Sequence, residues 1–186
     1  MNKFAFAALA LAASAAVTGP ALAQATGSVD LNGTVAARCS AASPISGNIT
    51  LGELTKADGK VDAAFSGNTG GLSRNFTVVC NGASPRLSVN ALPLVNASSA
   101  SPPAGYTNTI HYTATLNAMG AKGGTTSVSD QSSSTGATTG NVGDRLAAVQ
   151  NNVSLTVGSG VTGDSNAILE AGAYAGRIEV VVSPTA

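Results

Sequence analysis

Residues 27–39 read GSVDLNGTVAARC, and their side chains alternate in the manner of a half-buried β-strand. One face carries Val29, Leu31, Gly33, Val35 and Ala37, and the other carries Asp30, Asn32, Thr34, Ala36 and Arg38. The stretch therefore predicts a strand. Alternation alone does not say whether that strand joins a sheet of its own domain or the sheet of a neighbouring chain.

The segment before this strand, residues 1–23, has the pattern of a secretory signal peptide. Lys3 precedes an apolar run from Phe4 to Val17, and the small residues Ala21-Leu22-Ala23 mark a cleavage site. We expect the mature chain to begin at about Gln24. The sequence thus predicts an exported protein, secreted or carried through the periplasm to the cell surface, with no membrane insertion.

The composition is that of one turn-rich β domain. The chain has 186 residues, 22 of them Gly and none Trp, and only 4% are aromatic. Removal of the signal leaves about 163 residues, which suits a single domain. Nine basic and nine acidic residues are scattered without a basic patch, so nucleic acid is not expected as a partner.

Short strand patterns separated by turn residues recur along the rest of the chain, and none has a helical period over three turns. Strands are predicted at residues 49–54 (ITLGEL), 74–80, 86–92, 109–117, 145–149, 152–158 and 173–182, and those at 145–149 and 152–158 could also be one strand broken at Gln150-Asn151. A loop is predicted at 92–105, and a long loop or irregular hairpin, mobile in part, at 118–143. This spacing is typical of an all-β, immunoglobulin-like sandwich.

The last predicted strand, AYAGRIEVVV at 173–182, is strongly apolar on one face, where Ile178, Val180 and Val182 alternate. Only SPTA follows, so we expect no later strand to pair beside it. A sheet edge of this kind is normally paired or covered. The sequence therefore predicts a sandwich that lacks its last strand.

The two cysteines, Cys39 and Cys80, predict one disulfide in an exported chain. The bond would close a loop of about 42 residues and contribute roughly 4 kcal/mol. Their spacing excludes a CxxC redox motif, and two Cys with one His offer too few ligands for a metal site.

No catalytic arrangement is predicted. His111, the one histidine, falls on the polar face of its strand and is expected to be exposed. No GxSxG elbow, phosphate-binding loop or calcium loop is present in the sequence. We expect a protein that is not an enzyme, with no catalytic residue, metal or cofactor.

Four pieces of the chain carry a family resemblance: ATGSVDLNGTVAARC (25–39), ITLGEL (49–54), FTVVCNGASPRLSV (76–89) and AGAYAGRIEVVVSPTA (171–186). With them the chain resembles the spore coat protein U domain and the pilins of archaic chaperone–usher fimbriae. The ending, in which a tyrosine precedes alternating apolar residues, is the most specific of the four.

The resemblance implies an incomplete immunoglobulin-like domain over residues 39–186, preceded by a donor strand segment at 24–38. Such pilins polymerise by donor-strand exchange: a periplasmic chaperone first fills the groove, and the next subunit's donor strand replaces it at an outer-membrane usher. The expected partners are therefore identical or related pilin subunits, the chaperone and the usher. The expected product is a surface fimbria that serves adhesion or biofilm formation.

Carried onto this sequence, the resemblance assigns residues to both halves of the exchange. The donor face would be Val29, Leu31, Gly33 and Val35. One edge of the acceptor groove would be the strand with Ile178, Val180 and Val182. The Cys39–Cys80 bond would tie the base of the donor segment to the sheet.

A second class of function stays open from the residues alone. In it the first strand pairs within its own domain, and the protein is a secreted, self-complemented binding or matrix module that does not polymerise. An enzyme is a third class, disfavoured by the single histidine and by the lack of motifs.

Overall fold

The computed structural model describes residues 28–185, and the predicted signal peptide, residues 1–23, lies outside this range. Residues 24–27 of the predicted donor segment also lie outside it. The chain divides into two units, one ending at Thr34 and the other beginning at Val35, and each is described by itself.

The described residues form eleven strands and no helix, which confirms the predicted all-β class. Consequently no helix in residues 28–185 could span a membrane. The strands are β1 (Cys39–Ala41), β2 (Ser73–Phe76), β3 (Val78–Cys80), β4 (Arg86–Val95), β5 (Tyr106–Thr107), β6 (Thr109–Met119), β7 (Thr125–Gln131), β8 (Thr138–Asn141), β9 (Val153–Val161), β10 (Ile168–Leu169) and β11 (Ala175–Ser183).

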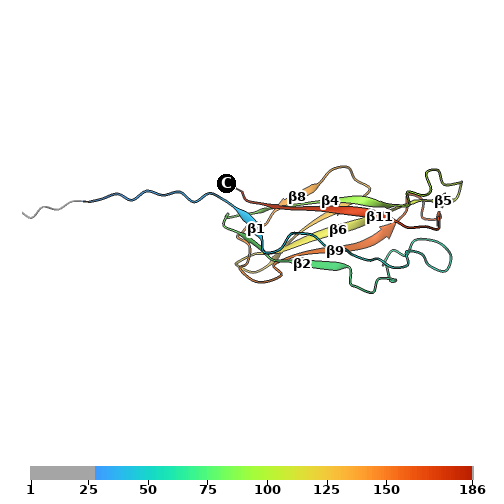
Figure 1. Cartoon of the computed structure of the whole chain (residues 1–186), viewed down its shortest axis with the longest axis horizontal. Helices are drawn as coiled ribbons and strands as arrows, with labels where there is room; N and C mark the ends of the chain where they lie inside the picture. The colour runs from blue at the N-terminus through green and yellow to red at the C-terminus, as the bar shows by residue number, and fades with distance from the viewer. Residues whose placement is uncertain (1–27, 186) are drawn as a thin grey trace, which may run out of the picture. The chain divides into compact units, whose positions relative to one another are not determined.

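The main sheet has the strand order β11-β4-β6-β9-β2, with β7 added on β6 and β8 added on β4. In Figure 1, β8, β4 and β11 run above β6, β9 and β2, so the sheet curls into two layers. The layers meet where Leu94 and Val95 of β4 pair with Ile110 and Thr109 of β6. Two small ladders, β1 with β3 and β5 with β10, lie outside this sheet.

The core lies between the two layers and is filled from alternate positions of the long strands. Along β6, for example, every second residue from Ile110 to Ala118 is buried. The largest fully buried apolar side chains are Phe65, Leu87, Ile110, Leu116, Val78, Val89 and Val153.

The strand predicted over residues 49–54 is wrong. This segment has no ladder, and the nearest pairing is an isolated bridge between Thr55 and Val61. Gly52 breaks the extended run because its φ is 73° and a Cβ there would lie 2.0 Å from the carbonyl oxygen of Gly67. The two glycines let the backbones meet and turn the chain away from a regular strand.

Residues 118–143 were predicted as a long loop or an irregular hairpin, and the long loop is wrong. These residues contain β7 and β8, and β7 pairs with β6 through seven residue pairs. The inward positions of β7 are Val128 and Asp130, and the Asp130 carboxylate accepts hydrogen bonds from the Ala91 N–H (2.8 Å) and the Thr138 hydroxyl (2.6 Å). A core-facing carboxylate removes the apolar alternation that would have indicated a strand.

Two other predicted strands differ in detail. The one at 74–80 is divided at Thr77, because β2 pairs with β9 whereas β3 pairs with β1. The one at 145–149 does not form, and Leu146 makes only an isolated bridge to Gly120.

Candidate functional site

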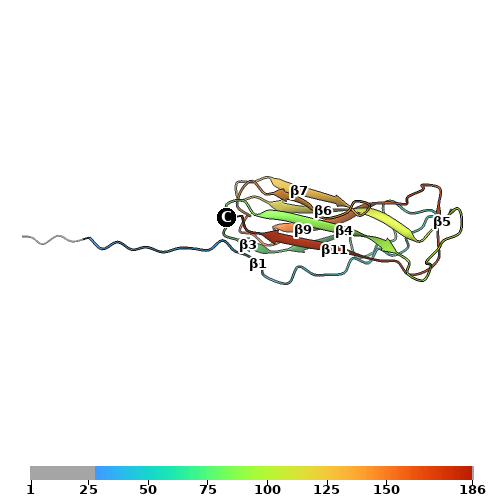
Figure 2. The same cartoon turned by 90° about the horizontal axis from the view of Figure 1, so that it is seen from above.

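A groove runs between β11 and β2, the two edges of the main sheet. Its cavity has a volume of about 240 Å³ and is lined from one side by Ile178 and Val180 and from the other by Arg74 and Phe76. Figure 2 shows β11 at the margin of its layer, with β4 beside it. Further lining residues come from the sheet behind: Leu94, Tyr112, Leu155 and Val157.

A second cavity, of about 790 Å³, continues the groove past the start of β11. The two cavities share Asn48, Ile49, Leu51, Leu94 and Gly176 among their lining residues. The groove therefore follows β11 from Ala175 to Val180 and extends beyond its first residue.

β11 pairs with β4 along one side through eight residue pairs, and no described strand pairs with its other side. Ile178, Val180 and Val182, the residues predicted for the groove edge, are half-buried and pack against the core from this edge. Between them the exposed residues Glu179 and Val181 point to the opposite face. A strand with one free side has unpaired backbone groups that can pair with another chain.

Residues 45–54, here called the wall segment, also line the groove, on the same side as β2. Its apolar side chains Ile45, Ile49, Leu51 and Leu54 pack against the core, yet it belongs to no ladder. Side chains from elsewhere hold it instead: the Arg74 guanidinium donates to the Asn48 carbonyl, and the Asn68 amide donates to the Thr50 carbonyl.

Arg74 is the one charged side chain on the inward face of β2, and it lies within the groove. Its guanidinium also donates to the Ser73 carbonyl (2.7 Å), so it is held by backbone oxygens. Among the described residues the only ion pair is Arg177 with Glu179, at 3.3 Å. The Arg74 charge is therefore paired with no carboxylate in the described chain.

Tyr112 joins the two strands beside the groove. Its hydroxyl donates to the Leu92 carbonyl of β4 (2.8 Å) and lies 3.2 Å from the Arg177 carbonyl of β11. Burial, together with the nearby negative charge of Asp130, raises the pKa of the Tyr112 hydroxyl to about 12. The hydroxyl therefore stays protonated and can donate at any physiological pH.

The described part of the predicted donor segment, residues 28–38, contains no strand. Its apolar side chains are exposed: Val29 by 87%, Leu31 by 93% and Val35 by 88%. Nothing lies within 4 Å of the position where a Cβ of Gly33 would be. Three large aliphatic side chains on one face of a strand-forming segment are thus left in solvent, where burial would be favourable.

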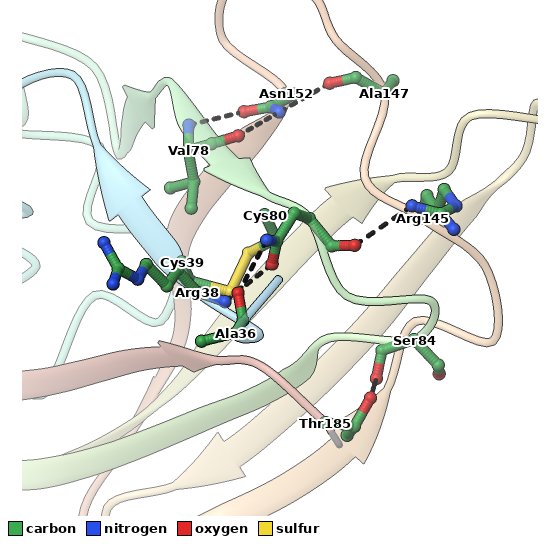
Figure 3. Close-up of a disulfide and its surroundings, with 11 residues drawn as sticks. Ala36, Arg38, Cys39, Val78, Cys80, Ser84, Arg145, Ala147, Asn152 and Thr185 are labelled. Atoms are coloured by element: carbon green, nitrogen blue, oxygen red, sulfur yellow. Dashed lines mark hydrogen bonds between the residues drawn. A yellow bond between two sulfur atoms is a disulfide. The ribbon is translucent and has the colours of Figure 1, made fainter. Parts of the chain in front are cut away.

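The segment ends at the predicted disulfide, which is confirmed. Cys39 and Cys80 are bonded, with 4.1 Å between their Cα atoms, and they are register partners in the β1–β3 ladder. Figure 3 shows the bond beside Arg38 and Ala36. The first residue of the domain body is therefore fixed covalently to the strand that leads into β4.

Away from the groove, the described titratable side chains lie mainly in turns and strands. No group of three or more His, Cys, Asp or Glu side chains that could hold a metal is found in residues 28–185. His111 is half-buried instead of exposed as predicted, and its Nδ1 has no hydrogen-bond partner. The pKa values of the exposed carboxyls of Asp62 and Asp144 are lowered mainly by backbone N–H groups, those of Ser66 and Lys122 respectively, which is the chemistry of turns.

Comparison of the chain with known protein families, with curated proteins and with solved structures gives no match. The family resemblance therefore stays a prediction from the sequence.

Sequence reasoning missed three parts of this site. Arg74 was not singled out, because an arginine in an alternating strand is normally placed on the solvent face. Part of the wall segment, residues 49–54, was assigned to a strand. Asn81 was not singled out either, because its Asn-Gly pair is a turn signal and nothing in the sequence indicates the partners of its side chain.

Proposed function

We propose that this chain is the structural subunit of a surface fibre, a fimbria or pilus, assembled by donor-strand exchange. In this proposal the domain body, residues 39–186, is an immunoglobulin-like sandwich that lacks its last strand. The missing strand is supplied by residues 24–38 of a second copy. One observation carries the proposal: the same chain contains a groove beside the unpaired side of β11 and an exposed apolar strand-forming segment.

The predicted donor strand is short enough to lie along β11. The donor positions from Val29 to Val35 would span about 20 Å as an extended strand, at about 3.3 Å per residue. β11 has nine residues and spans about 30 Å on the same basis. A donor strand beside β11 would place alternate side chains in the groove and its backbone groups opposite the free side of β11.

The energetics are adequate as well. Burial of Val29, Leu31 and Val35 would contribute about 5–9 kcal/mol in total. New ladder hydrogen bonds add about 1 kcal/mol each, and ordering of the segment opposes part of this gain. Gly33 contributes no side chain, so its place in the groove must be shallow or already filled.

The resemblance to archaic chaperone–usher pilins supplies the wider setting of the proposal. A periplasmic chaperone would cover the groove before assembly, and an outer-membrane usher would be the place of exchange. The fibre would serve adhesion or biofilm formation at the cell surface.

The proposal is tested by running purified residues 24–186, and a chain that begins at Cys39, on a denaturing gel without boiling. Residues 24–186 are expected to give a ladder of oligomers that collapses to one band on heating. The shorter chain, which lacks the donor, is expected to give no ladder. A stable monomer from residues 24–186, with no chaperone added, would count against polymerisation and favour a self-complemented module.

Matched single substitutions then locate the interaction. Leu31→Asp on the predicted buried face should abolish the ladder, whereas Asn32→Asp, one residue along, should leave it intact. On the acceptor side, Val180→Asp should abolish the ladder and Val181→Asp, on the exposed face, should not. Equal effects of the two members of either pair would contradict the proposed interface.

A further inference from the structure

A chain that carries both a donor segment and a groove can close on itself. A donor joined to its own groove by a few residues has an effective concentration in the millimolar range, well above a usual subunit concentration. Polymerisation therefore needs a feature that opposes closure. The base of the donor segment, residues 35–38, is the place to look for it, because these residues belong to the same unit as the groove.

The side chain of Asn81 holds this base in an extended form. Its Nδ2 donates to the Ala36 carbonyl at 2.8 Å, and its Oδ1 accepts from the Arg38 N–H at 2.6 Å. The Asn81 N–H donates in turn to the Arg38 carbonyl at 3.1 Å. These three hydrogen bonds, here called the Asn81 clamp, continue the β1–β3 ladder beyond Cys39, with a side-chain amide in the role of a peptide group.

The clamp is presented from a fixed support. The preceding residue, Cys80, is bonded to Cys39, and the Arg145 guanidinium donates to the Asn81 carbonyl at 3.0 Å. Figure 3 shows Arg145 reaching toward this strand end from its own loop. An amide whose backbone is held on both sides loses little further freedom when it binds residues 36–38.

The loop that follows the clamp lies beside the chain that leaves β11. Thr185, which follows β11, donates from its hydroxyl to the Ser84 carbonyl at 2.5 Å. A Cβ on Gly82 would lie 3.3 Å from the Thr185 carbonyl oxygen. The loop that begins with Asn81 therefore borders the end of β11, the strand that lines the groove.

Entry into that groove would require the chain to reverse direction just before β1. From Cys39 onward the chain runs through β1 into the wall segment, which lines the groove. Residues 36–38 lie beside Asn81, on the other side of Cys39 from the wall segment, which reaches Arg74. A donor that enters its own groove must therefore turn within residues 35–38. The Asn81 clamp holds those residues extended and makes such a turn cost its hydrogen bonds.

We propose that Asn81 is a positioning residue that prevents self-complementation and so presents the donor segment to a second copy of the chain. The inference rests on the proposed function and concerns its regulation: it explains why the subunit polymerises in place of closing. Asn81 acts through residues 36–38 and does not itself touch the groove.

The test compares Asn81→Ala with wild-type residues 24–186 and with Asn141→Ala, which removes an exposed amide on β8 outside the clamp. The ratio of closed monomer to oligomer is measured by gel filtration at matched subunit concentration. Loss of the two side-chain hydrogen bonds is expected to raise this ratio roughly fivefold in Asn81→Ala, with no change in Asn141→Ala. In the added monomer, hydrogen exchange of residues 28–35 should be slowed by insertion.

Arg145→Ala removes only the support of the clamp and should shift the ratio in the same direction by a smaller factor. This second variant keeps the inference testable if Asn81→Ala does not fold, as judged by its unfolding transition. If Asn81→Ala folds and polymerises with an unchanged ratio of monomer to oligomer, the role of Asn81 is overturned and the proposed function is not. The same holds if the ratio rises but residues 28–35 of the extra monomer exchange freely. A wild-type chain that forms no oligomer overturns the proposed function as well.

Discussion

β6 and the donor segment have the same alternating pattern and opposite surroundings. Along β6, Ile110, Ala114 and Leu116 are fully buried between two layers. Along the donor segment, Val29 and Leu31 are almost fully exposed. Both stretches present one apolar face and one polar face, so the pattern itself is not what separates them.

The difference lies in what each stretch has for neighbours. β6 is paired with β7 on one side and with β9 on the other, and β4 joins it at its first residues. Residues 28–38 join no strand, and among the described residues no strand pairs with the side of β11 that faces away from β4. Period-2 alternation therefore specifies a face to be buried, and the chain's topology decides whether its own sheet or another chain buries it.

The largest difference between β6 and the donor segment is expected when one leucine in each is replaced and the free energy of unfolding is measured. Leu116→Ala in β6 should lower the free energy of unfolding of the monomer by about 3 kcal/mol, through lost transfer free energy and a cavity. Leu31→Ala should change it by less than about 0.5 kcal/mol, because that side chain is already in solvent. Denaturant unfolding of unassembled chains measures both values.

In assembled chains the comparison should reverse in part. Leu31→Ala is expected to lower the heat resistance of the oligomer ladder, because the leucine would then be buried in a neighbour's groove. A loss of more than about 2 kcal/mol from Leu31→Ala in the monomer would mean that the donor segment is buried in its own domain.

A smaller effect is expected at Tyr112, which joins β4 to β11 beside the groove. Tyr112→Phe should lower the free energy of unfolding by about 1 kcal/mol, because the Leu92 carbonyl loses its donor. Tyr106→Phe, at an exposed tyrosine, is the matched control and should have no measurable effect. Urea unfolding at pH 7 gives both values.

Tyr112 also predicts a dependence on pH at the alkaline side. Its pKa is about 12 in the folded chain, whereas a free tyrosine has a pKa of about 10. Folding thus favours the protonated hydroxyl, so the stability it contributes is complete below pH 10 and is lost as the pH rises from about 10 to 12. The free energy of unfolding should fall less steeply between pH 10 and pH 12 in Tyr112→Phe than in the wild type. Equal slopes would contradict a raised pKa of Tyr112 in the folded chain.

Much of the fold follows from the sequence because its long strands combine alternation with large apolar residues. β4, β6, β9 and β11 were all predicted, and the disulfide followed from the presence of only two cysteines. These features depend on local pattern and on composition, which a single sequence contains.

The parts that sequence reasoning missed depend on partners far away in the chain. β7 was not predicted because its inward residue Asp130 is polar, and the Ala91 N–H of another strand donates a hydrogen bond to its carboxylate. The strand expected at 49–54 fails because Gly52 meets Gly67. The Asn81 clamp is likewise a contact across more than forty residues, and a short-range turn signal gives no indication of it.

The most direct measurement of the central claim is hydrogen exchange, read by mass spectrometry, on assembled residues 24–186 and on the same chain dissociated by heat and cooled. If the donor of one copy fills the groove of another, residues 28–35 and β11 should both become protected on assembly, and to a similar degree. Leu31→Asp should remove both protections together. Oligomers in which residues 28–35 exchange as fast as in a dissociated chain would contradict donor-strand exchange.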